Sequence, residues 1–195
     1  MPAETTRTLP PRDECKALPG FVSFRAQLAA AVARRDAKFL LSVADPEIAV
    51  HFGDGSGRDA FAAEWKLKEK QPSSIWPEIA RMLRLGCGAE DGTAWMPYFF
   101  QRFPDEIDPF EGVVVVRPGA QLWASARGRP IRPLRLWTVI EVAEWSPRGG
   151  WGRVKLRDGK RAYVREADVR SPLHYRMIFE RRKGRWMMTA FIAGD

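Results

Sequence analysis

The sequence contains few cysteines and histidines, and it has no long apolar run. Its 195 residues include two cysteines and two histidines. No stretch approaches the ~18 consecutive apolar residues of a transmembrane helix, so we expect no membrane span. The polar, Pro-rich start, MPAETTRTLPPRDE, has no apolar core of a signal peptide. No Cys-x-x-Cys spacing occurs, and His51 and His174 have no ligand partner at metal spacing. We therefore expect no metal site and no cofactor.

Recognisable catalytic motifs are also missing. The glycines around Ser56 in GDGSGR fit neither a phosphate loop nor a nucleophile elbow, so they predict a turn. Cys87 follows a glycine at a predicted helix end, where no helix dipole lowers a thiol pKa, which argues against a Cys87–His174 nucleophile and base. His51 and Asp54 remain as acid–base candidates that could face a pocket. The alternative for His51 is a hydrogen-bonded structural residue. The sequence thus favours a protein that is not an enzyme.

The charge is unevenly distributed between the two halves of the chain. Residues 1–111 carry 14 basic and 17 acidic side chains, whereas residues 112–195 carry 18 basic and 7 acidic ones. This asymmetry predicts an anionic partner for the second half. The alternative is a sheet whose outward positions are basic because such side chains protect edge strands from aggregation.

The two cysteines, Cys15 and Cys87, lie far apart in the sequence. A disulfide between them would tie the N-terminal segment to the body of the protein, and two separate buried thiols are the alternative. A disulfide implies an oxidising compartment, so we expect a periplasmic or extracellular location, with the cytoplasm as the alternative.

The first half of the chain reads as helices with one strand. Phe21 to Ala33 has apolar residues at three- and four-residue steps, and Asp36 is a predicted N-cap of a short second helix. Further along we expect a strand at 48–52, a helix from Ser56 or Asp59 through Trp65, a helix at 74–85, and an extended segment at 93–103.

The segment FRAQLAAAVARRDAKFLLSVADPEIAVHFGDGSGRDAF resembles the opening of the nuclear transport factor 2-like family. The predicted hairpin of residues 175–180 and 185–192 fits the closing hairpin of that family. The resemblance covers about residues 21–61 and 173–193. It implies a curved antiparallel sheet wrapped round helices, forming a cone with a pocket.

Between these parts, residues 113–169 read as short strands separated by Gly and Pro, which is typical of a small barrel. Residues 149–164, GGWGRVKLRDGKRAYV, predict a hairpin that turns at Asp158-Gly159. Together with GAQLWA at 119–124 and the run at 134–142, this hairpin resembles the bacterial Src-homology-3-like domain. Trp137 stands where that pattern commonly has a glycine. The resemblance implies recognition of a peptide or wall polymer.

The predicted fold class is α+β, with a barrel inserted into a cone-shaped domain. The predicted domains are an arm at 1–20, a cone at 21–111 and 172–195, and a Src-homology-3-like barrel at 112–171. A simple tandem of two domains is the alternative.

Aromatic and basic residues of the barrel could form a binding groove if some of the rings stay exposed. The alternative is that most of the rings fill the barrel core. The candidate binding residues are Trp123, Arg129, Arg132, Trp137, Trp151, Arg153 and Tyr163.

The leading functional hypothesis is a non-enzymatic binding protein of the bacterial cell envelope, with a peptide, peptidoglycan or another anionic polymer as partner. One alternative is a small-molecule carrier or enzyme that uses the cone pocket. The other is nucleic-acid binding by the basic half, against which export argues.

Overall fold

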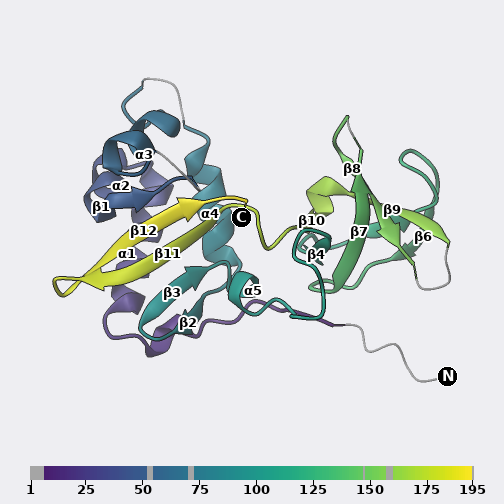
Figure 1. The fold of residues 1–195 in the computed structure, drawn as a ribbon, viewed down its shortest axis with the longest axis horizontal. Helices are drawn as coiled ribbons and strands as arrows, with labels where there is room; N and C mark the ends of the chain where they lie inside the picture. Colours follow the sequence, from purple (N-terminus) through teal and green to yellow (C-terminus); the bar gives the residue numbers. More distant parts are fainter. Residues whose placement is uncertain (1–6, 52–54, 70–72, 147, 157–159, 195) are drawn as a thin grey trace. The chain divides into compact units, whose positions relative to one another are not determined.

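The computed structural model describes residues 7–51, 55–69, 73–146, 148–156 and 160–194. Contacts divide the chain into two compact units. We call Pro11–Arg102 with Leu173–Asp195 the helical unit, and Met1–Pro10 with Phe103–Pro172 the sheet unit. Within the described ranges no helix is both long and apolar enough to cross a membrane. The chain contains helices and mostly antiparallel strands, which confirms the predicted α+β class (Figure 1).

The helical unit places helices against one five-stranded sheet (Figure 1). The order of the strands is β1-β12-β11-β3-β2, and all neighbours are antiparallel except β1 and β12. The helices are α1 (Phe21–Arg34), α2 (Ala37–Val43), α3 (Arg58–Glu64), α4 (Ile75–Arg84) and the short α5 (Tyr98–Gln101). The strands are β1 (Ala44–Ala49), β2 (Gly88–Glu90), β3 (Thr93–Met96), β11 (Arg176–Arg182) and β12 (Arg185–Ile192).

Local sequence explains the start of the first two helices. Gly20 precedes α1 with a φ of 75°, a left-handed conformation that glycine adopts without steric cost. Asp36 caps α2, and its carboxylate accepts a hydrogen bond from the Phe39 amide at 2.9 Å. Both helices and this cap confirm the sequence prediction.

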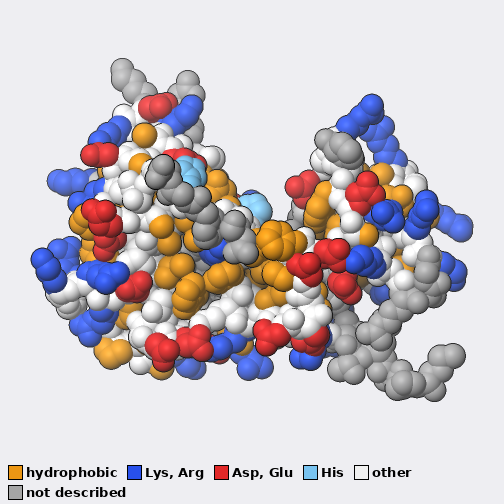
Figure 2. Space-filling view, in the orientation of Figure 1, with side chains coloured by type: hydrophobic (Ala, Val, Ile, Leu, Met, Phe, Trp, Pro, Cys, Tyr) orange, Lys and Arg blue, Asp and Glu red, His pale blue; other side chains and the backbone are white. Residues whose placement is uncertain are grey.

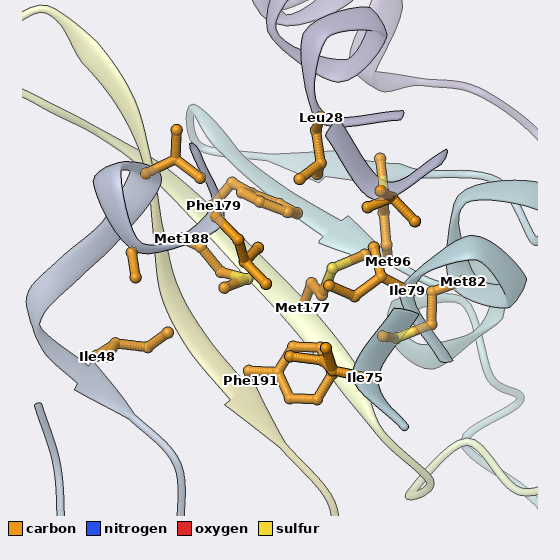
Figure 3. Packing of buried hydrophobic residues seen from close by; sticks show 14 of the residues in the cluster. Leu28, Ile48, Ile75, Ile79, Met82, Met96, Met177, Phe179, Met188 and Phe191 are labelled. Atoms are coloured by element: carbon orange, nitrogen blue, oxygen red, sulfur yellow. The ribbon is translucent and has the colours of Figure 1, made fainter. Parts of the chain in front are cut away.

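Apolar side chains fill the space between the helices and the sheet of the helical unit (Figure 3). Leu28 of α1 and Met82 of α4 lie on the helix side, while Met177 and Phe191 lie on the strand side. Each of these four side chains is at most 1% exposed. This packing makes the interior a continuous core.

Two predictions in the helical unit are wrong. The strand expected at 48–52 lies at Ala44–Ala49, with Pro46 inside it. A proline is tolerated there because β1 is an edge strand and needs fewer ladder hydrogen bonds. The extended segment expected at 93–103 is the strand β3 followed by α5, with Pro97 as the N-cap residue of that helix. A proline at this end removes no helical hydrogen bond.

The sheet unit consists of short antiparallel strands in the order β10-β4-β7-β8-β9-β5-β6. Among the described residues, β10 and β6 are the two edge strands of this sheet and do not pair with each other. The sheet is therefore open, and the predicted closed barrel is not formed. A 3-10 helix, Glu166–Asp168, precedes the last strand. The strands are β4 (Gly112–Val115), β5 (Gln121–Trp123), β6 (Pro130–Pro133), β7 (Val139–Trp145), β8 (Trp151–Lys155), β9 (Arg161–Arg165) and β10 (Val169–Arg170).

A second, smaller core lies inside the sheet unit. It is built from valine, alanine and leucine side chains, among them Val113, Leu122, Val142, Val154 and Val164. The strands β8 and β9 pair from Trp151–Arg165 to Lys155–Arg161, which confirms the predicted hairpin strands. Its turn, Asp158-Gly159, lies outside the described residues.

The segment predicted as an N-terminal arm contributes to both units. Thr8 forms an antiparallel bridge with Thr138, and the Leu9 amide donates to the Trp137 carbonyl at 2.8 Å within the sheet unit. Further along, Asp13 bridges Cys87 within the helical unit. The chain from 7 to 15 is therefore held by backbone pairing in each unit.

Candidate aromatic and basic binding face

Strand alternation separates buried from outward side chains in β8 and β9. Gly152 and Val154 in β8, and Ala162 and Val164 in β9, are buried. Successive side chains of a strand point to opposite faces, so the residues between them point outward. The outward positions are Trp151, Arg153, Lys155, Arg161, Tyr163 and Arg165.

Strand pairing brings a third ring to this outward surface. Tyr163 is the partner of Arg153 on one side and of Trp123 of β5 on the other. Trp151 is paired with Arg165 in the neighbouring row. We call the surface formed by Trp123, Trp151, Arg153, Tyr163 and Arg165 the aromatic–basic face. Four of the seven predicted binding residues lie on it, namely Trp123, Trp151, Arg153 and Tyr163.

The two tryptophan rings of this face contact each other and a cation. The centroids of Trp123 and Trp151 are 5.6 Å apart, with the ring planes at 85°. The Arg165 guanidinium lies 4.4 Å from the Trp123 centroid and 5.5 Å from that of Trp151. These distances allow cation–π attraction to both rings. Arg165 was not among the predicted binding residues, although the alternation Arg161-Tyr163-Arg165 contained the signal.

Two hollows adjoin Trp151 on the surface. One, of about 450 Å³, is lined by Trp145, Trp151, Arg153, Arg161 and Tyr163, together with Ala126, Glu144 and Ser146. The other, of about 460 Å³, is lined by Gly150, Trp151, Arg165, Glu166 and Ala167. Because Trp151 lines both, a bound chain could cross its ring and occupy the two hollows.

Charge on the aromatic–basic face is predominantly positive. Arg153 forms an ion pair with Glu144 at 2.9 Å, and both side chains are partly exposed. Arg161 has no acidic partner among the described residues. In the space-filling view, basic side chains lie over the region of β6, β8 and β9 (Figure 2). An anionic ligand would therefore meet a favourable potential at this surface.

Three of the predicted binding residues are not among those that define this face. Arg129 is exposed after the β5 strand, and its carbonyl accepts a hydrogen bond from the Ala124 amide. Arg132 is exposed on β6 and lines a different cavity. Trp137 is half-buried in a turn with a φ of 66°, the left-handed region that glycine favours.

His51, one of the two acid–base candidates, points to the surface and not to the interior of the helical unit. His51 is 51% exposed, and its Nε2 lies 2.8 Å from Glu64. Asp54 lies outside the described residues. His51 is thus an exposed side chain in contact with one carboxylate.

Cys15 and Cys87 form a disulfide, as one of the two sequence interpretations predicted. Their Cα atoms are 5.7 Å apart. Asp13, Cys15 and Cys87 place three potential metal-binding atoms close together within the described part of the chain. The two sulfurs are bonded to each other, so they provide no thiolate ligands for a metal.

Comparison with known proteins gives no family assignment. No family model and no curated protein matches the chain. Two solved structures were found, and one is a designed protein whose name begins Rd1NTF2_05. It is 11% identical, with 89% of this chain and 96% of that chain covered and a TM-score of 0.30.

The other solved structure is a domain from Xanthomonas campestris, named for the association domain of calcium/calmodulin dependent protein kinase II. It is also 11% identical, with 100% of this chain and 97% of that chain covered and a TM-score of 0.30. At this level of similarity, neither structure assigns a function to this chain.

Proposed function

We propose that the chain is a non-enzymatic binding protein of the bacterial cell envelope. Its sheet unit would recognise a peptide or an anionic wall polymer, such as peptidoglycan, through the aromatic–basic face. The observation that carries this proposal is the gathering of Trp123, Trp151 and Tyr163 with Arg153 and Arg165 on one outward surface. Rings and guanidinium groups are the side chains most enriched at the centres of binding interfaces.

The surface suits an extended ligand better than a compact one. Trp151 lines both adjoining hollows, so apolar or planar groups of the ligand would contact its ring. Anionic groups of the same chain would meet Arg153 and Arg161 on one side of Trp151 and Arg165 on the other. Rings supply contact area, and the cations attract the polymer from solution.

The compartment is part of the same proposal. The Cys15–Cys87 disulfide fits an oxidising compartment, which supports a periplasmic or extracellular location. We also propose that the sheet unit is a Src-homology-3-like module and the helical unit a nuclear transport factor 2-like one. The short antiparallel strands around a valine-rich core support the first of these. The helices packed on a largely antiparallel sheet support the second.

A co-sedimentation experiment with purified peptidoglycan sacculi tests this function. We expect the intact chain to sediment with sacculi at low salt and to be released as salt rises, because exposed charges are screened. The double variant R153Q/R161Q should bind sacculi at least about fivefold more weakly than the native chain. Trp151→Ala should also bind sacculi more weakly, but the salt dependence of its binding should be no steeper than that of the native chain. The matched control is R34Q/R84Q, which removes two exposed charges from the helical unit.

Failure to sediment at low salt would contradict the wall-polymer proposal, as would equal losses in R153Q/R161Q and R34Q/R84Q. Circular dichroism of each variant separates loss of binding from loss of folding. The same variants can be used to test the second candidate function, which is binding of single-stranded nucleic acid.

Binding of single-stranded nucleic acid is the second candidate, since bases stack on exposed rings beside arginines. The Trp123–Trp151 pair with Arg165 is the observation that favours it. Titration of a fluorescent single-stranded oligonucleotide would give an affinity that falls steeply with salt if this function holds. A flat salt dependence, or no binding at low salt, would remove it.

A further inference from the structure

A cavity of about 540 Å³ lies within the sheet unit, apart from the aromatic–basic face. Residues from β6, from the turn that follows it, and from β7 and β8 line it. Leu122, Leu134 and Val154, which belong to the apolar core of this unit, form part of its wall. A cavity of this volume with an apolar wall is in the size range of small-ligand sites.

One residue that lines the cavity has a buried hydroxyl group without a partner. Thr138 lines the cavity and is 5% exposed, and its Oγ1 has no hydrogen-bond partner among the described residues. The backbone groups of Thr138 are occupied, since its amide donates to the Arg135 carbonyl and its carbonyl accepts from the Val115 amide. A buried hydroxyl normally has a partner, and this one has none among the described residues. Its Oγ1 is fully buried, so a ligand reaches it only when the side chains that line the cavity shift.

Two arginines of the lining have no acidic partner among the described residues. These are Arg132 of β6 and Arg135, three residues before Thr138. The other two cations of the lining are engaged, because Arg7 pairs with Glu106 and Lys155 pairs with Glu111. Glu141 is the acidic residue that the described residues contribute to the lining. Arg132 and Arg135 are therefore the lining cations whose charge no acidic residue of the described chain neutralises.

We propose that this cavity binds a small organic anion with one carboxylate and an apolar body. The carboxylate accepts hydrogen bonds from the Arg132 and Arg135 guanidinium groups and from the Thr138 hydroxyl. Guanidinium groups suit this role because their planar N–H donors match a carboxylate. The apolar body contacts Leu122, Leu134 and Val154. This site is separate from the aromatic–basic face and needs neither Trp123 nor Trp151.

Octanoate and its neutral analogue octanol test the proposal on the full-length, disulfide-bonded chain. Titrations followed by amide NMR should give saturable shifts at Thr138, Val139 and Ile140 with octanoate. Octanol, which has the same carbon chain and no charge, should bind at least about fivefold more weakly because the arginines have no anion to contact. The double variant R132Q/R135Q should weaken octanoate binding by about tenfold or more.

Two further variants sharpen the test. Thr138→Val keeps the shape of the side chain and removes the hydroxyl, so octanoate binding should fall by roughly two- to tenfold. The control R127Q/R148Q removes two exposed arginines of the same unit outside this lining and should stay within about twofold of the native affinity.

Three results would overturn the proposal: no saturable shifts, equal affinity for octanol and octanoate, or unchanged affinity in R132Q/R135Q. Unchanged binding in Thr138→Val would remove the hydroxyl as a ligand donor. Trp151→Ala should leave octanoate binding intact while it weakens polymer binding, so the two proposals fail independently. Loss of octanoate shifts in Trp151→Ala would contradict a separate site.

Discussion

The guanidinium of Arg165 lies over the ring of Trp123, 4.4 Å from its centroid, and within reach of Trp151 as well. The three residues come from β5, β8 and β9, so the contact joins the hairpin of β8 and β9 to a strand that lies earlier in the sequence. The contact fixes two aromatic rings in an outward position. It therefore serves both the stability and the proposed binding function of the sheet unit.

We predict that Arg165→Gln lowers the free energy of unfolding by about 0.5–1 kcal/mol, because an exposed cation–π contact has about that strength. The loss should be accompanied by weaker polymer binding. Urea unfolding, followed by tryptophan fluorescence, measures the change. The matched control is Arg161→Gln, an outward residue of the same strand that has no ring contact among the described residues. If both variants lose the same amount of unfolding free energy, the contact of Arg165 with the rings does not contribute to stability.

The sequence predicted the elements that depend on local pattern. The helix Phe21–Arg34 follows from apolar spacing, and the cap at Asp36 follows from the chemistry of its side chain. The strands β8 and β9 follow from the alternation of Val154 and Val164 with charged residues. In each case the signal lies within a few residues of the element that it specifies.

Part of what the sequence did not reveal depends on contacts between distant segments, and part depends on local signals that are short or ambiguous. The strand β1 pairs in parallel with β12, and no local pattern contains that pairing. Pro97 excludes a helix interior but permits a helix start, and the chain uses the second option. The hairpin of β2 and β3, which turns at Asp91-Gly92, was also missed because its strands are only three and four residues long.

The aromatic–basic face was predicted only in part, because some of its residues share a strand pattern and others meet through strand pairing. Trp151, Arg153 and Tyr163 share a face by strand alternation alone, which a sequence contains. Trp123 lies beside Tyr163 because β5 pairs with β9, and the sequence pattern does not contain this pairing. The separate cavity at Thr138 depends on how residues 134–138 turn, and the positive φ of Trp137 in this turn is rare for a bulky residue.

Reduction of the Cys15–Cys87 disulfide should lower the free energy of unfolding by roughly 4 kcal/mol, on the chain-entropy model for a loop of this length. Because the two cysteines are bonded to each other, a thiol assay on the denatured protein should detect none before reduction. Thermal unfolding with and without reductant measures the loss, and the C15A/C87A variant provides a reductant-insensitive control. Two titratable thiols in the untreated, denatured protein would contradict the bond.

The ion pair of Glu14 and Arg102 should make stability depend on pH in the acid range. The hydrogen bond from Arg102, at 2.8 Å, is the main cause that lowers the pKa of Glu14 below its ordinary 4.5, and burial opposes it. Because the pKa of Glu14 is lower in the folded state, the pair stabilises the fold fully above pH 4.5. This stabilisation is lost as the pH falls through the pKa that Glu14 has in the folded state.

Urea unfolding between pH 2 and pH 7 measures this dependence, and Glu14→Gln should remove part of the decline. The control is Glu69→Gln, an exposed residue whose side chain has no partner among the described residues. If Glu14→Gln has the same pH dependence as the native chain, the pair does not contribute to acid stability.

Gly86 and Gly92 offer a test of how closely the N-terminal segment packs on the helical unit. Both have a φ of 80°, so an alanine at either position has the same left-handed strain, about 1–2 kcal/mol. Gly92 has no atom within 4 Å of an added Cβ. At Gly86 the added Cβ would overlap the Arg12 carbonyl oxygen and lie 2.9 Å from the Arg12 nitrogen. The Arg12 backbone is held in place, because its carbonyl accepts a hydrogen bond from the Cys87 amide at 2.8 Å.

We therefore predict that Gly86→Ala lowers the free energy of unfolding by about 1–3 kcal/mol more than Gly92→Ala does. Urea unfolding of the two variants measures the difference, and equal losses would mean that the segment yields to the added methyl group.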